Sequence, residues 1–514
     1  MIARGRGRAN GPWGCYAGGF RGEAMPEVTP SSIHAAIAGQ AAQRPDAVAV
    51  VNNGVMVSYA ALARNAAQFT QALAGLGLAA GQSVALQCGD LYLHLLLLLA
   101  ADRIGAASAS FTSGELAQPL PLLGQVDRVL TELPQRIAGA RRLDPITQAW
   151  VASVLASQPG GAMADAPQSP NTPVRVLRTS GTTGLAKRIV LTRRIFDGRV
   201  AVWAEKEQLR PGDRSLIVAP YTFAMVHYVS WVALRAGATL VFENRCGMAE
   251  AVARHGVTQI VTVVNQLHDA LKHLPAGFVK PPRLSLSAVG GRVSPELFRR
   301  ALALLATQLA DAYGTNEVGT IARRSEADTS PYSTIVPGVT VEIVDDADRP
   351  LPQGRLGRVR ARGPNMVDSY PDDAEATARL FRQGWFYPGD LGVLHAPGLL
   401  EIAGRADDLL NLGGVKAAPE ALEETFRARA AIDDVGVCTL PNADGIEELW
   451  VAVVYDAPDD RDIRARLKPA FADFPHGRAH LVKLAAIPRT DTGKIKRAEL
   501  KAMVKAAAAP PPPG

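Results

Sequence analysis

Cysteine is scarce in this 514-residue sequence, and its four copies stand far apart, at Cys15, Cys88, Cys246 and Cys438. No two of them form a CxxC pair, which excludes a zinc knuckle of the usual spacing, and their scatter gives no disulfide framework. Few and isolated thiols are typical of a reducing compartment. We therefore expect a cytoplasmic protein.

Long apolar runs are also missing. The most apolar stretch, Leu91 to Ala101, is interrupted by His94 and is much shorter than the roughly 20 residues that a membrane helix needs. We expect a buried core helix there and no membrane span.

The two chain ends lack the patterns of folded structure. The first residues are rich in Gly and Arg but carry no apolar segment of the kind found in export signals, so we expect a disordered basic extension at 1–24. The last residues are rich in Ala and Pro. Because prolines cannot sustain a helix, we expect a disordered tail at 506–514.

Charge of one sign is not in large excess. The chain has 55 Lys and Arg residues against 49 Asp and Glu residues, and half of that net +6 lies in the basic extension. No Lys/Arg cluster interleaved with aromatic residues follows, so we expect no nucleic-acid partner. With 47% hydrophobic and 20% charged residues, the composition excludes disordered, collagen-like and coiled-coil proteins.

Helical and strand-like patterns alternate along most of the chain. Amphipathic stretches at 33–44 and 59–77 alternate with β-branched runs at 47–51 and 83–87, the pattern of βα units around a largely parallel sheet. A Gly/Pro/Ser/Asn-rich linker at 158–173 precedes a second such region, with strand-like runs at 215–219, 238–242 and 259–264.

A different pattern begins further on. Residues 338–392 have strand runs and Gly/Asp/Pro turns with little helical periodicity, which predicts a compact β subdomain. We expect an α/β protein whose large N-terminal domain, 25–405, holds two doubly wound sheets plus this β subdomain. A small α+β C-terminal domain is expected at 406–505.

The first segment that suggests chemistry is a loop rich in hydroxyl groups and glycine. It follows a strand-like run at 174–177 and consists of Thr179-Ser180-Gly181-Thr182-Thr183-Gly184-Leu185-Ala186-Lys187. Its glycines let the backbone approach a ligand, while its hydroxyl and N–H groups and Lys187 suit phosphate oxygens. It is not a Walker loop, because no lysine follows Gly184 directly. Alone, such a loop is structural about as often as functional.

Four further motifs follow in order, so that the loop and these motifs together span about 320 residues. They are Asp311-Ala312-Tyr313-Gly314-Thr315-Asn316-Glu317, Gly384-Trp385-Phe386-Tyr387-Pro388-Gly389-Asp390, Gly404-Arg405-Ala406-Asp407-Asp408 and Pro488-Arg489-Thr490-Asp491-Thr492-Gly493-Lys494-Ile495. With the loop, the series resembles the adenylate-forming superfamily of acyl-CoA synthetases, peptide-synthetase adenylation domains and luciferases. It departs from the family pattern at Ala186, where proline is usual, at Arg188, and at Asn316, where a threonine is common.

The resemblance implies a site for ATP and Mg²⁺. It assigns the β- and γ-phosphates to Ser180, Thr182, Thr183, Gly184 and Lys187, and Mg²⁺ to Glu317, whose oxygens suit a hard cation. It places adenine against Tyr313, with the exocyclic amine at Asp311 and the Gly290-Gly291 backbone beside the base. Other implied nucleotide contacts are Thr179, Gly181, Ala312, Gly314, Thr315, Asn316, Asp390 for the ribose hydroxyls and Arg405 for ribose or phosphate.

The resemblance also implies a mobile small domain. Lys494 matches the family's catalytic lysine, which offsets the charge that develops while a carboxylate attacks the α-phosphorus of ATP. Asp407 matches the hinge about which the small domain pivots between two half-reactions. Gly413 and Gly414 would line the passage for the coenzyme A thiol.

The acyl pocket is the least determined part of the implied site. Phe223 matches the aromatic residue that gates the substrate carboxylate, and Ala224 stands where amino-acid-activating relatives carry an aspartate, which disfavours an α-amino acid. His227 is equally well interpreted as a pocket residue or as a core histidine. The remaining lining is expected to be small and apolar, from Ala288, Val289, Ala312 and Thr320, and suits an aryl or medium acyl acid.

We therefore expect an ATP-dependent carboxylic acid:CoA ligase, an acyl-CoA synthetase or aryl-CoA ligase that forms an acyl-adenylate and then a thioester. One alternative is a free-standing enzyme that loads a carrier-protein phosphopantetheine. Another is a catalytically silent adenylate-binding protein, which the retained charged residues disfavour. The sequence leaves open whether the chain pairs with a second copy as a homodimer.

Overall fold

The computed structural model describes residues 32–508 apart from 118–119, 159–163, 180–186, 292, 326–327, 329, 407, 409, 413–414, 418, 430–431, 443–446, 456–462, 464, 468–478 and 491–492. The expected basic extension, 1–24, therefore lies outside the described residues. The last helix, α14, spans Arg497–Ala508, so the predicted disorder is wrong for 506–508. The alanine run continues the helix because alanine is the best helix former.

A six-stranded sheet organises the N-terminal region. Its strand order is β6-β5-β3-β4-β7-β8, and all neighbours are parallel except β7 and β8, which form an antiparallel hairpin. The strands are β3 (Ser83–Gln87), β4 (Ala107–Ser110), β5 (Arg128–Thr131), β6 (Leu143–Pro145), β7 (Pro173–Thr179) and β8 (Lys187–Thr192). The helices of this region are α1 (Ile33–Gln43), α2 (Tyr59–Gly75), α3 (Leu91–Ile104), α4 (Leu122–Gln125) and α5 (Gln148–Ala156).

Helix α3 is the expected core helix. Asp90 caps its start by accepting from Leu93 N at 2.8 Å, and Gly105 ends it in the left-handed conformation. Its residues from Leu93 through Ala101 are buried. Along the part of the chain that the structure describes, no helix is long and apolar enough to cross a membrane.

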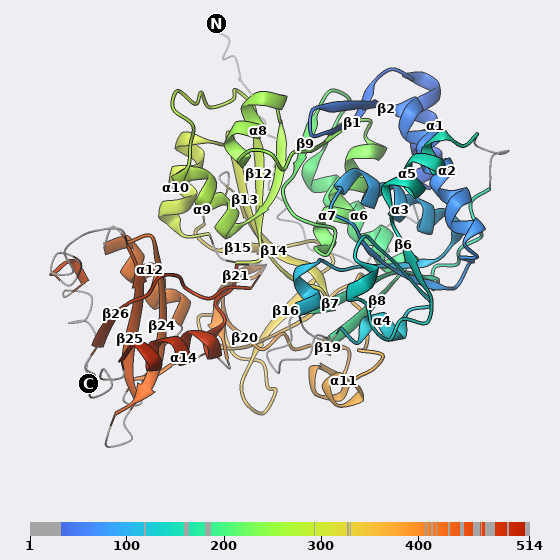
Figure 1. Cartoon of the computed structure of the whole chain (residues 1–514). Coiled ribbons are helices and arrows are strands. Elements are labelled where there is room, and N and C mark those ends of the chain that lie inside the picture. The colour runs from blue at the N-terminus through green and yellow to red at the C-terminus, as the bar shows by residue number, and fades with distance from the viewer. Residues whose placement is uncertain are drawn as a thin grey trace, which may run out of the picture.

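A second sheet of 15 strands runs through the rest of the large domain (Figure 1). The part β1-β10-β9-β11-β12-β13 is parallel, and antiparallel strands extend it without a break. Its strands are β1 (Val48–Asn52), β2 (Val55–Ser58), β9 (Arg214–Ile217), β10 (Thr239–Phe242), β11 (Gln259–Val263), β12 (Ser285–Val289), β13 (Gln308–Thr315), β14 (Gly319–Ser325), β15 (Ser333–Ile335), β16 (Thr340–Val344), β17 (Gly357–Arg362), β18 (Phe381–Arg382), β19 (Trp385–Phe386), β20 (Asp390–Ala396) and β21 (Leu399–Arg405).

Two features of this sheet differ from the expectation. The expected β subdomain is hydrogen-bonded into the same sheet as the second doubly wound region. The early run at 47–51 also joins this sheet, because β1 pairs with β10 in register Val50 to Leu240. Local patterning cannot predict a strand partner that lies 190 residues away.

Helices cover both faces of the 15-stranded sheet. Helices α6 (Arg193–Glu207) and α7 (Ala224–Arg235) share one apolar cluster with α1, α2 and α3, which joins the two sheets. On the other face, a second cluster packs α8 (Met248–His255), α9 (Val264–Lys272) and α10 (Pro295–Leu304). One short helix, α11 (Ala374–Leu380), lies beside β18.

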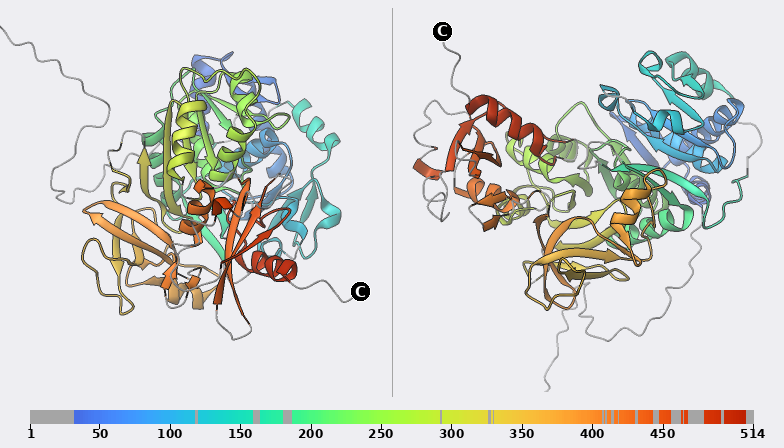
Figure 2. Two further views of the ribbon diagram at one scale, coloured as in Figure 1. Left: turned by 90° about the vertical axis from the view of Figure 1, so that its left-hand side faces the viewer. Right: turned by 90° about the horizontal axis from the view of Figure 1, so that it is seen from below.

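The C-terminal domain has a sheet and apolar clusters of its own. Strands β24, β25 and β26 form a three-stranded sheet with one apolar cluster on each face. Figure 2 shows this domain beside the large one. Its elements are β22 (Leu410–Leu412), β23 (Val415–Ala417), α12 (Pro419–Arg429), β24 (Asp434–Pro441), β25 (Glu447–Val454), β26 (Ala479–Lys483) and α14.

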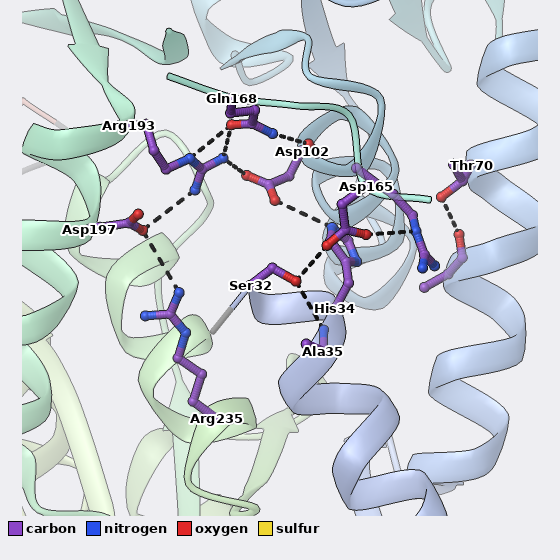
Figure 3. Close-up of polar contacts among 12 residues, drawn as sticks. Ser32, His34, Ala35, Thr70, Asp102, Asp165, Gln168, Arg193, Asp197 and Arg235 are labelled. Carbon is purple, nitrogen blue, oxygen red and sulfur yellow. Dashed lines mark hydrogen bonds and ion pairs between the residues drawn. The ribbon is translucent and has the colours of Figure 1, made fainter. Parts of the chain in front are cut away.

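Largely buried ion pairs connect the helices around the N-terminal sheet (Figure 3). Asp102 at the end of α3 pairs with Arg193 of α6 and, at 3.3 Å, with His34 of α1. Arg193 also approaches Asp197 at 3.5 Å, and Arg235 of α7 approaches Asp197 at 3.8 Å. Burial alone would raise the pKa of Asp102, but Arg193 and His34 outweigh it and hold that pKa below its usual value. Asp102 is therefore charged.

We expect Asp102→Asn to lower the free energy of unfolding by about 3 kcal/mol, because it leaves Arg193 buried beside a neutral group. Urea denaturation of the purified protein measures the change. The matched control is Asp345→Asn, whose ion pair with Arg349 is exposed on the arginine side and should cost far less stability. Equal losses in the two variants would contradict the prediction.

Candidate active site

A large cleft lies between the 15-stranded sheet and the C-terminal domain. Its volume is about 2910 Å³, several times that of a pocket for one small ligand, which is about 300–1,000 Å³. Residues from all five sequence motifs line it, including Thr179, Glu317, Asp390, Arg405 and Lys494. The cleft can therefore hold more than one substrate at a time.

The hairpin β7-β8 presents the expected phosphate loop to this cleft. Thr179 and Lys187 are paired across the hairpin and both line the cleft, so the two ends of the loop are fixed there. Residues Ser180, Gly181, Thr182, Thr183 and Gly184 lie outside the described residues.

The turn between β13 and β14 carries the expected metal-binding carboxylate. Glu317 is buried, and the Tyr370 hydroxyl donates to its Oε1 at 2.6 Å. Lys187 Nζ lies 5.8 Å from the centre of the same Tyr370 ring. Burial raises the pKa of Tyr370 and the Glu317 carboxylate raises it further, so Tyr370 keeps its proton and stays the donor. Tyr370 thus contacts both Glu317 and Lys187, for which the sequence predicted separate roles in binding Mg²⁺ and phosphate.

The backbone of this turn is held by Arg199 of α6. This guanidinium is buried and donates to the carbonyl oxygens of Asn316 at 2.9 Å and Glu317 at 3.0 Å, and to Asn365 at 3.0 Å. Its Nη1 also reaches the Tyr228 hydroxyl at 3.3 Å. Neither Arg199 nor Tyr370 lies in a motif, so nothing in the sequence marked them.

The close approach of β13 and β14 requires a glycine at 314. A Cβ on Gly314 would lie 2.4 Å from the Gly319 carbonyl oxygen. The β13 and β14 backbones meet there with a register shift between Tyr313 and Gly314. Ala312, Gly314, Thr315 and Asn316 all line the cleft.

Tyr313 and Asp390 form a buried pair across the cleft wall. The Tyr313 hydroxyl donates to Asp390 Oδ2 at 2.5 Å, and Arg405 Nη1 lies 3.3 Å from Oδ1. Burial raises the pKa of Asp390 against the opposing effects of Tyr313, Arg405 and Lys494. The expected adenine contact and the expected ribose contact are therefore joined directly, and the charge of Lys494 reaches them.

Asp311 lies on β13, and Gly290 and Gly291 directly follow the neighbouring β12. Asp311, Gly290 and Gly291 line the cleft, and β12 and β13 are paired in register from Ser285 to Val289. Asp311 Oδ2 already accepts from Arg324 at 3.0 Å. One face of this carboxylate is thus occupied by an ion pair with Arg324 that no sequence motif indicated.

The predicted acyl-pocket residues separate into two groups. Phe223, Ala224, Val289 and Thr320 line the cleft, together with Met225 and Tyr228, which the prediction missed. Ala288 does not: it is fully buried in the cluster that packs α8, α9 and α10, because alternate residues of a strand face opposite sides.

His227 is a core residue. It is 4% exposed, is not among the residues that line the cleft, and its ring packs edge to face against Phe196 and Trp231. Neither ring nitrogen has a hydrogen-bond partner among the described residues. Burial holds the pKa of His227 well below its usual value, so the ring is neutral. Of the two interpretations left open by the sequence, the geometry favours the core histidine.

Lys494 lies in a tight loop of the C-terminal domain. The Thr490 N–H donates to the Lys494 carbonyl at 2.8 Å, and the Lys494 N–H donates to Thr490 Oγ1 at 3.1 Å. Thr490, Gly493 and Lys494 of this loop line the cleft. The expected hinge residue Asp407 and the expected passage residues Gly413 and Gly414 lie outside the described residues.

A single carboxylate suits the expected metal. Within the described ranges, no group of three or more His, Cys, Asp or Glu side chains is arranged to hold a metal ion. Mg²⁺ does not require such a cage, because it keeps waters and binds through one or two carboxylates plus substrate phosphates. The buried Glu317 beside the expected phosphate site fits that role.

Known proteins match this chain over most of its length. Residues 37–371 match the family described as AMP-binding enzyme. The chain is 26% identical to a medium-chain fatty-acid–CoA ligase of Escherichia coli, over 88% of this chain and 87% of the relative. It is also 26% identical to the fatty acid–[acyl-carrier-protein] ligase ScoC of Streptomyces coeruleorubidus, over 90% and 94%. ATP-bound MatB from Rhodopseudomonas palustris superposes with a TM-score of 0.79 at 22% identity, covering 92% of this chain and 98% of MatB.

Proposed function

Because the chain belongs to the family of AMP-binding, adenylate-forming enzymes, we propose that it joins a carboxylic acid to ATP, releases pyrophosphate, and transfers the acyl group from the adenylate to the thiol of coenzyme A. The observation that carries this proposal is the convergence of Lys187, Glu317, Asp390 and Lys494 on one cleft. These four charged groups come from segments that are far apart in the sequence.

Charge neutralisation explains why the cleft needs these groups. A carboxylate must approach a triphosphate, and oriented cations and hydrogen-bond donors lower the cost of bringing the two anions together. In the proposed arrangement Lys187 binds the phosphates, Glu317 holds Mg²⁺ and Lys494 stabilises the charge that develops while the acyl-adenylate forms, so Lys494 serves the first step and not thioester formation. Bound Mg²⁺ would supply Lewis-acid stabilisation of the phosphate oxygens.

The nucleoside would lie against Tyr313 and Asp390. The buried Asp390 carboxylate can accept from both ribose hydroxyls, and the Tyr313 ring offers an aromatic face for adenine. We assign Arg405 to the ribose or phosphate, and Asp311, Gly290 and Gly291 to the edge of the base. The hinge role of Asp407, the thiol passage at Gly413 and Gly414 and the division of the chain near residue 405 belong to the same proposal.

The acid itself is proposed to be an aryl or medium-chain acyl acid. Phe223, Ala224, Met225 and Val289 give the pocket an apolar lining, and an aspartate that would pair with an α-ammonium is absent at 224. A free-standing enzyme that loads a carrier protein is the second candidate, since ScoC, a relative of similar identity, is named as an acyl-carrier-protein ligase.

Pyrophosphate release across a panel of aryl and fatty acids tests the proposal. We expect release with at least one acid, and a CoA thioester when coenzyme A is added. Release without a thioester would favour the carrier-protein loader. No release with any acid would contradict the proposal and favour an adenylate-binding protein without catalysis.

A further inference from the structure

One polar face of α9 lies against the domain that carries Lys494. Asn265, His268, Asp269 and Lys272 line the cleft, and their spacing of three, four and seven residues places them on one side of a helix. The opposite side, with Leu267 and Leu271, is buried in the large domain. We call these four residues the docking face.

The first end of the docking face holds the Lys494 loop. Asn265 Nδ2 donates to the carbonyl of Gly493 at 3.1 Å, one residue before Lys494. Arg489 Nη1 donates to the same oxygen at 2.7 Å. A Cβ on Gly493, whose φ is +81°, would lie 2.6 Å from Asn265 Nδ2, so the loop approaches α9 closely at a residue without a side chain.

The second end of the docking face, at Lys272, contacts the segment Asp433-Asp434, which in turn binds Arg489 of the Lys494 loop. Lys272 Nζ lies 2.7 Å from Asp433 Oδ1. The next residue, Asp434, receives Arg489 Nε at 3.0 Å and Nη2 at 2.6 Å. Lys272 therefore pairs with the segment that anchors Arg489, and Arg489 in turn holds the Gly493 carbonyl.

We propose that the docking face of α9 positions Lys494 beside Asp390 for the adenylation step. Asn265 and Lys272 would act as positioning residues, because they contact the loop and its anchor rather than the reacting atoms. This inference rests on the proposed function, in which Lys494 is needed for adenylate formation and not for thioester formation.

A charge exchange between Lys272 and Asp433 tests the proposal. Loss of an exposed ion pair changes an equilibrium by about fivefold at most, and Lys272→Glu also adds repulsion from Asp433 and Asp434. We expect Lys272→Glu to lower the rate of adenylation about tenfold and to leave thioester formation from preformed acyl-adenylate within twofold. The double variant Lys272→Glu/Asp433→Lys should recover most of the adenylation rate.

The matched control is Arg299→Glu on the neighbouring α10, where the arginine is exposed and pairs only with Glu296 of its own helix among the described residues. It should leave both half-reactions unchanged. Equal loss of both half-reactions in Lys272→Glu, an unchanged adenylation rate, or no recovery in the double variant would overturn the proposal.

A disulfide measures the docked geometry without relying on catalysis. The Cβ position at Gly493 lies 3.2 Å from Asn265 Cβ, close to the roughly 3.5–4.5 Å of a disulfide. We expect Asn265→Cys/Gly493→Cys to cross-link under mild oxidation, seen as a mobility shift that both single variants lack. Compared with its own reduced form, the oxidised double variant should keep adenylation and lose thioester formation. If the double variant folds but forms no cross-link, the docking proposal fails. If the double variant cross-links as expected but the wild-type protein releases no pyrophosphate with any acid, only the proposed function is refuted.

Discussion

Lys494→Ala is expected to lower the rate of acyl-adenylate formation by at least about a hundredfold, since a preorganised charge at the reacting phosphate contributes roughly 10²–10³ in rate. Lys494 lines the cleft, and its charge reaches Asp390. Thioester formation from preformed acyl-adenylate should change by less than about threefold, because the proposed second step takes place with this loop withdrawn. Pyrophosphate release and single-turnover thioester formation measure the two steps separately.

The control for this variant is Lys505→Ala, an exposed lysine on α14 in the same domain. It should leave both rates unchanged. A Lys494→Ala enzyme that loses the two steps equally would contradict the assignment of Lys494 to the first step alone.

The second large effect is expected for Glu317→Gln. Glutamine keeps the size of the side chain and an acceptor for the Tyr370 hydroxyl, but it removes the negative charge that would hold Mg²⁺. We expect adenylation to fall about 10- to 100-fold, and part of the loss to be restored at high Mg²⁺ concentration. The measurement is the rate of pyrophosphate release against Mg²⁺ concentration.

Tyr370→Phe separates the charge of Glu317 from its orientation. This variant keeps the carboxylate and removes the hydrogen bond at 2.6 Å, so it should cost less than Glu317→Gln and leave the Mg²⁺ requirement nearly unchanged. A Glu317→Gln enzyme with the wild-type rate and the wild-type Mg²⁺ dependence would show that this carboxylate does not hold the metal.

Elements with a strong local signal could be predicted from the sequence. The apolar run Leu91 to Ala101, where a core helix was expected, lies within α3, and the structure shows that Asp90 and Gly105 cap its two ends. The strand-like run at 174–177 lies within β7, which ends where the loop was expected to begin. In both cases the residues that determine the structure lie within one short segment.

Contacts between distant segments could not be predicted in this way. Arg199 binds carbonyl groups of Asn316 and Glu317 more than 115 residues away, and any residue type supplies such a carbonyl, so no pattern marks the pair. His227 shows a related difficulty. The sequence left open whether it is a pocket residue or a core residue. In the structure α7 turns it toward Trp231 in the core, and only packing determines which face of a buried helix meets a pocket.

The separate sheet and apolar clusters of the C-terminal domain have a thermodynamic consequence. No described strand of that domain hydrogen-bonds to the 15-stranded sheet, and neither of its apolar clusters includes a residue of the large domain. A rotation of the domain would thus exchange polar groups with water while nearly all apolar surface stays covered. Because large heat-capacity changes come mainly from apolar exposure, the equilibrium between the two proposed orientations should have a small heat-capacity change and an almost linear van 't Hoff plot.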